Sequence, residues 1–110
     1  MNHLATSAME MANLQHALLL SGVLMVIGLA GFLSRRNLIV MFLCTELMFQ
    51  AAVVAMVAFG RWYWDFSGQV FVIFILTIAA AEAALALALV VLLHRRRPTL
   101  DAESWTELRE

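Results

Sequence analysis

The chain has 110 residues, of which 64% are hydrophobic and 14% are charged, and its formal net charge is -1. A typical soluble domain is about half apolar and a quarter charged. A chain this short and this apolar cannot bury all its apolar side chains in a core of its own, so the composition excludes an ordinary soluble domain and indicates a membrane protein. The net charge of -1 says nothing about partners, and we expect no nucleic acid among them.

Three apolar runs follow one another along the chain, at residues 14–33, 38–59 and 70–93. Each exceeds the roughly 18 apolar residues that suggest a membrane span. The runs must be helical, because lipid offers no hydrogen-bond partner to an open strand edge. We therefore predict an all-α membrane protein with three transmembrane helices, in a transmembrane domain of residues 14–97 with spans at about 14–34, 38–60 and 69–93. Residues 1–13 are then an N-terminal extension and residues 98–110 a polar tail.

The arginines predict the orientation of these spans. Five of them flank ends that fall on one side of a three-span chain: Arg35, Arg36, Arg95, Arg96 and Arg97. The positive-inside rule places such ends in the cytoplasm. We expect the N-terminus outside, the C-terminal tail in the cytoplasm, and a multi-pass protein of the bacterial inner membrane.

Two acids interrupt the apolar runs, Glu46 in the second and Glu82 in the third. Glu46 lies ten residues after Arg36, or about 15 Å along a helix, and Glu82 lies thirteen residues before Arg95, or about 19 Å. The hydrocarbon core is about 30 Å thick, so both acids fall near its middle although their helices run in opposite directions. A charged acid at a helix centre costs about 2.5–3.5 kcal/mol or more, and such residues are functional by default.

The dry surroundings of these acids favour the neutral carboxyl, which can release its proton when water or a cation arrives. At the 8–10 Å axis separation of packed helices, two such charges would repel by about 1.7 kcal/mol at an effective dielectric near 20. Ionising one acid would therefore disfavour ionising the other, and we expect Glu46 and Glu82 to form a proton relay. The alternative is a structural hydrogen bond from each acid to a neighbouring helix.

Other polar and small residues accompany the acids. Gln50 lies four residues after Glu46, on the same helix face, and could hydrogen-bond its carboxyl. Alanines at spacings of three and four make the face around Glu82 small, which permits close approach of a helix or of water, although plain helix packing explains them too. Arg35 and Arg36 are a topology signal or lie at the cytoplasmic mouth of a proton path.

The sequence contains no motif that is typical of a cofactor or metal site. It has a single cysteine, Cys44, inside an apolar run, and no CxxC pair, histidine cluster or glycine-rich phosphate loop. No internal disulfide can form, and we expect neither a cofactor nor a metal site.

Two segments resemble a known family, the K subunit of NADH–quinone oxidoreductase, respiratory complex I. They are "LQHALLLSGVLMVIGLAGFLSRRNLIVMFLCTELMFQAA" and "SGQVFVIFILTIAAAEAALALALVVLLHRRR", which cover nearly all of residues 14–97. The most specific features are "RRN" ten residues before a midmembrane Glu, and "AAAEAA" in the third run. The N-terminal extension departs from the usual short start, and Met9 and Met11 offer alternative starts.

The resemblance implies a membrane-arm subunit that contributes to proton pumping and carries no redox group. NADH, FMN, iron–sulfur clusters and quinone are then expected in other subunits, and the partners are membrane subunits of the J, A, H and N types in a hetero-oligomer. The family's two helix carboxylates fall on Glu46 and Glu82, and its arginine pair on Arg35 and Arg36.

Other classes fit the sequence less well. The C subunit of multisubunit cation/proton antiporters shares the three-helix plan, but its members typically lack the two acids. Small multidrug transporters usually have four spans and one functional acid, and a rotor-ring subunit needs two helices and one carboxylate. A purely structural membrane subunit remains an alternative.

Overall fold

The structure is a computed structural model that describes residues 1–106, so the last four residues of the predicted tail lie outside the described part. It consists of three long helices, α1 (Asn2–Ser34), α2 (Leu38–Trp62) and α3 (Ser67–Arg96), and one short helix, α4 (Glu103–Thr106). Each long helix is long and apolar enough to cross a membrane. The prediction of an all-α protein with three membrane-spanning helices is thus confirmed. The N-terminal extension continues α1, which begins at Asn2.

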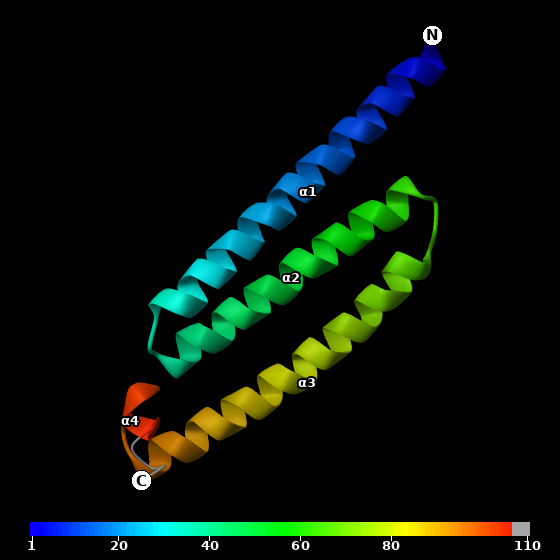
Figure 1. The fold of residues 1–110 in the computed structure, drawn as a ribbon. Helices are drawn as coiled ribbons and strands as arrows, with labels where there is room; N and C mark the ends of the chain where they lie inside the picture. Colours follow the sequence, from blue (N-terminus) through cyan, green and yellow to red (C-terminus); the bar gives the residue numbers. More distant parts are fainter. Residues whose placement is uncertain (107–110) are drawn as a thin grey trace.

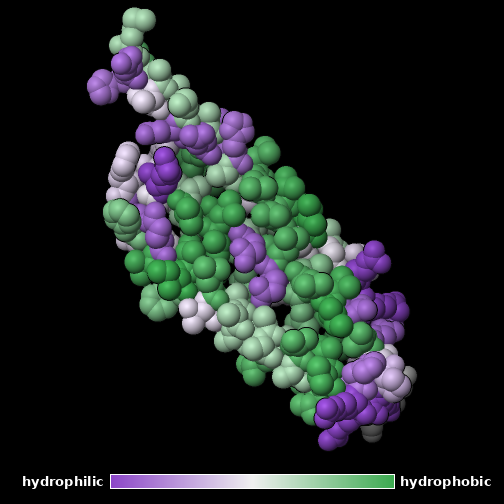
Figure 2. All heavy atoms as spheres, turned by 180° about the vertical axis from the view of Figure 1, so that it is seen from behind, coloured by the Kyte–Doolittle hydropathy of each residue, from purple (hydrophilic) through white to green (hydrophobic). Residues whose placement is uncertain are grey.

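The three long helices lie antiparallel in a flat row, with α2 in the middle (Figure 1). Among the described residues α2 contacts both neighbours, whereas α1 and α3 do not contact each other. The row measures 69 × 26 × 19 Å. Apolar side chains cover its middle and hydrophilic ones gather toward its ends, with a small hydrophilic patch midway along (Figure 2). A single row cannot bury both faces of any helix, so most large apolar side chains are left facing outward.

Helices α1 and α2 pack closely because the residues between them are small. Ser21 is only 8% exposed, and its hydroxyl donates a hydrogen bond to the carbonyl oxygen of Ala51 at 2.7 Å. About two turns further along α1, Gly28 lies against Cys44 and Met48, and a Cβ atom added there would lie 3.0 Å from the Cys44 carbonyl oxygen. Small residues of this kind let membrane helices approach each other closely.

Helix α3 meets α2 through a stripe of small and β-branched residues. Its buried members are Val72, Ala79, Ala86 and Val90. Their spacings of seven and four residues keep them on one face of the helix. Near the loop that joins α2 to α3, a Cβ atom added to Gly68 would lie 2.7 Å from the carbonyl oxygen of Met56. The backbones of the two helices are therefore nearly in contact there.

The turns between the helices are fixed by local hydrogen bonds. Asn37 caps α2 by accepting the backbone N–H of Ile39 at 3.0 Å. Two residues after the end of α2, Trp64 lies in the left-handed region, at φ 53°. The Asp65 N–H then donates a hydrogen bond to the Gly60 carbonyl oxygen. This is the Schellman arrangement, which usually places glycine at the left-handed position.

The polar tail folds back onto the turn between α1 and α2. The Leu38 N–H bonds to the Leu100 carbonyl oxygen, and the Ala102 N–H bonds to the Arg36 carbonyl oxygen, each at 2.9 Å. These bonds form an isolated antiparallel bridge between Asn37 and Asp101. The tail therefore ties the end of α3 to the start of α2, at the end of the row that carries most of the arginines.

Candidate functional site

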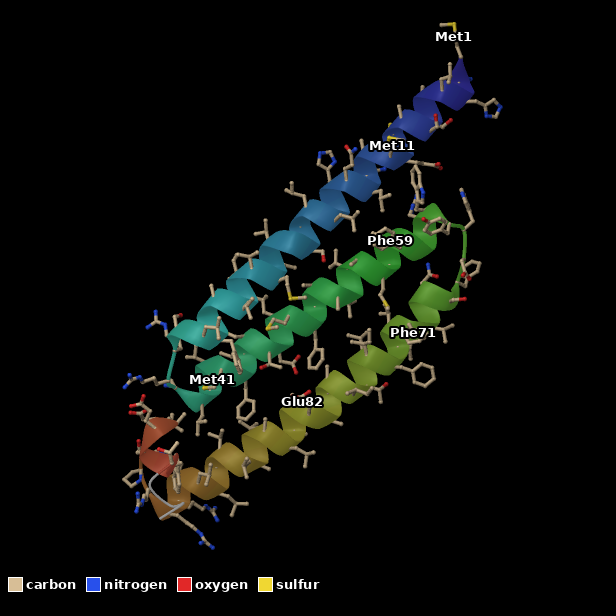
Figure 3. The ribbon with its side chains drawn as sticks, in the orientation of Figure 1. Met1, Met11, Met41, Phe59, Phe71 and Glu82 are labelled. Atoms are coloured by element: carbon tan, nitrogen blue, oxygen red, sulfur yellow. The ribbon has the colours of Figure 1, made fainter. Side chains whose placement is uncertain are left out.

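Glu46 and Glu82 line the same cleft, between α2 and α3. Glu46 lies eight residues into α2, and Glu82 lies midway along α3 (Figure 3). The cleft has a volume of about 220 Å³ and is lined by Ile39, Phe42, Leu43, Thr45, Glu46, Glu82, Ala83, Ala86 and Leu87. Both carboxyl groups thus belong to one mainly apolar space, although 36 residues separate them in the sequence.

The cleft is open on one side of the helix row. Glu46 is half-buried and Glu82 is exposed. Ala79 and Ala86 are buried toward α2, which brings α3 close enough for Glu82 to share the cleft at the rim of the contact. The small alanine face therefore packs against a helix in this chain, while the carboxyl groups remain accessible to a group from outside it.

Gln50 lies on the same face of α2 as Glu46, as its spacing predicts, but not in the cleft. It is one helical turn further along, on the side away from Ile39, and it is exposed. Within residues 1–106 no hydrogen bond joins it to Glu46. The structure thus leaves its amide on the open face of the row beside the acids.

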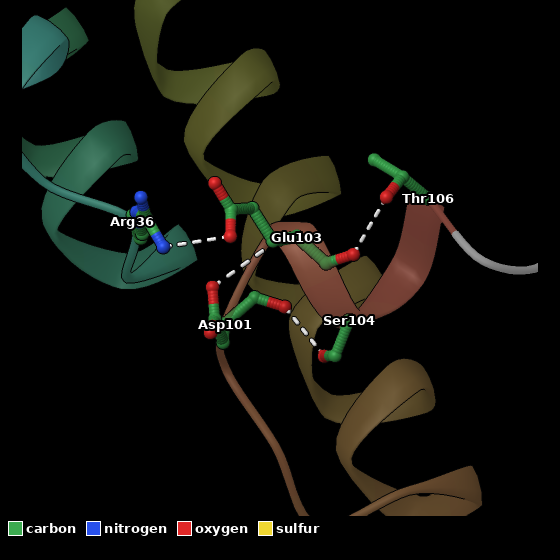
Figure 4. Close-up of polar contacts among 5 residues, drawn as sticks. All are labelled: Arg36, Asp101, Glu103, Ser104 and Thr106. Atoms are coloured by element: carbon green, nitrogen blue, oxygen red, sulfur yellow. Dashed lines mark hydrogen bonds and ion pairs between the residues drawn. The ribbon is translucent and has the colours of Figure 1, made fainter.

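Arg35 and Arg36 lie at the turn after α1 and are not among the residues that line the cleft. Arg36 forms an ion pair with Glu103 of the tail, with 2.6 Å between Nη1 and Oε2 (Figure 4). Both side chains are mostly exposed, so this ion pair is of the kind that contributes about 0–1 kcal/mol. Sequence analysis did not predict this partner for Arg36.

Thr45 is the polar residue of the cleft that sequence analysis missed. It is half-buried, and its hydroxyl donates to the carbonyl oxygen of Met41 at 3.0 Å. The available signal was a hydroxyl residue directly before Glu46 in an otherwise apolar run. That signal is weak, because such hydroxyls commonly bond the carbonyl four residues back and serve no other purpose.

Among residues 1–106, no cationic side chain lines the cleft. In the part of the chain that the structure describes, no group of three or more His, Cys, Asp or Glu residues is placed to hold a metal ion. The electrostatics of the cleft are therefore set by two acids and one hydroxyl. Such a set can bind, store and pass protons, and it can attract a cation from outside the chain.

Three helices that are each long and apolar enough to span a membrane, with two acids in the cleft between two of them, define a multi-pass membrane protein. Residues 16–110 match the family described as NADH-ubiquinone/plastoquinone oxidoreductase chain 4L.

Individual relatives carry a related name, NADH-quinone oxidoreductase subunit K. That of Persephonella marina is 53% identical over 95 residues, which are 86% of this chain and 95% of the relative. That of a Sulfurihydrogenibium species is 48% identical over 99 residues, 90% of this chain and 99% of the relative. That of Bordetella avium is 48% identical over 97 residues, 87% of this chain and 95% of the relative. The chain belongs to the family of subunit K of NADH–quinone oxidoreductase, as its sequence predicted, and is thus a subunit of a multisubunit enzyme.

Proposed function

We propose that the chain relays protons in the membrane arm of a proton-translocating NADH–quinone oxidoreductase, through Glu46 and Glu82. The observation that carries this proposal is their position in one cleft, contributed from two different helices. A lone acid in a membrane helix can be satisfied by a structural hydrogen bond. Two acids in one apolar space repel when both are charged, so a proton added to one changes the tendency of the other to hold its own.

The relay needs partners, because the row of three helices leaves the cleft open on one side. A carboxylate facing lipid is costly, so a neighbouring subunit has to cover this side. We propose membrane subunits of the J, A, H and N types as neighbours in a hetero-oligomer, in the bacterial inner membrane. The arginine-rich end and the tail then face the cytoplasm, and the N-terminus faces outward.

The redox chemistry belongs to other subunits in this proposal. NADH, FMN, iron–sulfur clusters and quinone are bound elsewhere, and this chain contributes none of the electron-transfer steps. Redox energy reaches the cleft as altered hydration or as a shifted charge nearby, which changes which acid is protonated.

Three further residues support the relay in different ways. Gln50, on the open face beside the acids, is placed to hydrogen-bond a group that enters from a neighbouring subunit. Arg35 and Arg36 lie at the cytoplasmic end, where Arg36 also holds the tail through Glu103. These roles are positioning roles, since none of the three side chains lines the cleft.

The test compares Glu46→Gln and Glu82→Gln with a matched control, Glu10→Gln, in the assembled complex. Glu10 is an acid of the same chain that lies outside the cleft, near the free end of α1. Glutamine preserves the size of each side chain and removes its ability to ionise. We expect proton pumping by membrane vesicles to fall about a hundredfold for each cleft variant, the lower end of what a positioned acid–base group supplies. The Glu10 variant should pump normally.

Assembly is measured in the same membranes by native gel electrophoresis and by NADH oxidation with an artificial electron acceptor. These should be unchanged in all three variants. Normal pumping in both cleft variants would refute the relay and favour a purely structural subunit.

A further inference from the structure

The relay proposed above leaves one polar group of the cleft unused, the hydroxyl of Thr45. Of the described residues that line the cleft, three carry a polar side chain, and Thr45 is the one among them that does not ionise. It precedes Glu46 directly in α2, and both residues line the cleft.

The Thr45 hydroxyl has a fixed direction. Its hydrogen is donated to the Met41 carbonyl oxygen at 3.0 Å. A hydroxyl oxygen also has two acceptor lone pairs, and no other hydrogen bond to this oxygen is formed among the described residues. The oxygen of this cleft-lining residue therefore keeps its acceptor capacity, and its position is held by the bond to the helix backbone.

The cleft has room for water and only a few places to hold it. At about 30 Å³ of liquid volume per molecule, 220 Å³ accommodates a short chain of waters. A bound water needs two to four polar partners, and apolar walls supply none. With the two carboxyl groups alone, a bridging water has only two polar partners, the smallest number that holds it. Thr45 adds a third partner.

We propose that Thr45 is a positioning residue of the proton relay, and this inference rests on the relay function of Glu46 and Glu82. A water in the cleft donates one hydrogen to the Thr45 oxygen, which directs its second hydrogen toward a carboxylate. In the transfer step, an O–H bond of one carboxylic acid breaks as its proton passes to the water. The water releases a different proton to the other carboxylate, where the new O–H bond forms. The water is regenerated, and the threonine exchanges no proton.

The test uses two substitutions at Thr45 and one matched control in the assembled complex. Thr45→Val keeps the branched shape and removes the hydroxyl, whereas Thr45→Ser keeps the hydroxyl. Thr77→Val is the control, because Thr77 of α3 makes the same type of hydrogen bond, to the Ile73 carbonyl oxygen at 2.8 Å, but does not line the cleft.

We expect Thr45→Val to lower the rate of proton pumping and of NADH–quinone turnover about fivefold, which corresponds to about 1 kcal/mol, the net value of one hydrogen bond. Thr45→Ser and Thr77→Val should behave as the unaltered protein. The ratio of rates in H₂O and D₂O should rise in Thr45→Val, because proton transfer becomes slower than the other steps. A mere loss of stability would change the amount of complex but not this ratio. If Thr45→Val does not assemble, Thr45→Ala removes the same hydroxyl without adding bulk and should give the same result.

Three results would overturn the inference: an unchanged rate without the hydroxyl, an equal loss in Thr45→Ser or Thr77→Val, or a lower rate with an unchanged isotope ratio. Glu46→Gln and Glu82→Gln, measured in the same vesicles, separate this failure from failure of the relay itself. If those variants lose pumping while Thr45→Val does not, only the role of Thr45 falls. If they pump normally, the relay fails and the role of Thr45 falls with it.

Discussion

Substitution of two glycines of α1 provides a quantitative test of how α1 and α2 pack. A Cβ atom added to Gly28 would lie 2.7 Å from the Met48 Cγ atom, 3.0 Å from the Cys44 carbonyl oxygen and 3.3 Å from the Met48 backbone nitrogen. A Cβ atom added to Gly22 would meet nothing within 4 Å. Carbon atoms in contact normally lie about 3.5–4.0 Å apart, so Gly28→Ala forces a movement and Gly22→Ala does not.

The size of the effect follows from comparing the two variants. Replacing glycine by alanine within a helix gains roughly 0.5–1 kcal/mol, and this gain is common to both positions. The difference between the variants is therefore the overpacking cost at Gly28, about 1–3 kcal/mol. The Met48 side chain can rotate away, but the Cys44 carbonyl oxygen belongs to the α2 backbone. We expect Met48→Ala to rescue Gly28→Ala only in part, because the two helices still have to separate.

The assay is the fraction of this chain retained in the complex after heating in detergent, measured by native gel electrophoresis. Gly22→Ala should match or exceed the unaltered protein, and Gly28→Ala should be released at a lower temperature. Equal behaviour of the two variants, or full rescue by Met48→Ala, would refute the close backbone contact between α1 and α2.

Two further predictions concern the ends of the helices. The side chains of Arg36 and Glu103 are 69% and 61% exposed. A double-mutant cycle with alanine should therefore give a coupling free energy of about 0.2–1 kcal/mol that disappears in high salt. A larger coupling, or one that salt does not weaken, would contradict this prediction. At the other end, hydrogen bonds from the Ser67 N–H and hydroxyl lower the pKa of Asp65 below its ordinary value of 3.8. A lowered pKa stabilises the loop above pH 3.8, and this contribution is lost as the pH falls below that value. Ser67→Ala should move the NMR titration midpoint of Asp65 up toward 3.8, since only the N–H bond remains, and an unmoved midpoint would exclude a contribution of the hydroxyl.

The three long helices were predictable from the sequence because each depends on a local property. Hydropathy over some twenty residues decides whether a run can span a bilayer, and lipid then permits only a helix. The expected depth of Glu46 and Glu82 in the membrane rests on the same reasoning, since rise per residue converts sequence distance into depth. That the two acids share a cleft did not follow, because it depends on the rotation of each helix about its axis.

Contacts between residues far apart in the sequence account for the other features of the structure that the sequence did not predict. Gln50 was expected on the face of Glu46, but only the packing of α3 decides where along that face the cleft ends. The pairing of Arg36 with Glu103 joins residues 67 positions apart, and it depends on the backbone bridge between Asn37 and Asp101. Patterns of hydropathy and charge carry no information about such a bridge. Thr45 was overlooked because a hydroxyl in a membrane helix is usually satisfied by its own backbone.

The flat arrangement of the helices links the proposed relay to the assembly of the complex. A bundle of helices could enclose two acids by itself, but a row of three leaves its middle helix open on one face, and that face carries Glu46 and Gln50. Whatever covers the cleft sets the surroundings of both carboxyl groups, and therefore changes the balance between their charged and neutral forms. In the proposed relay, a small movement of the covering subunit is thus sufficient to take up or release a proton, without any change within this chain.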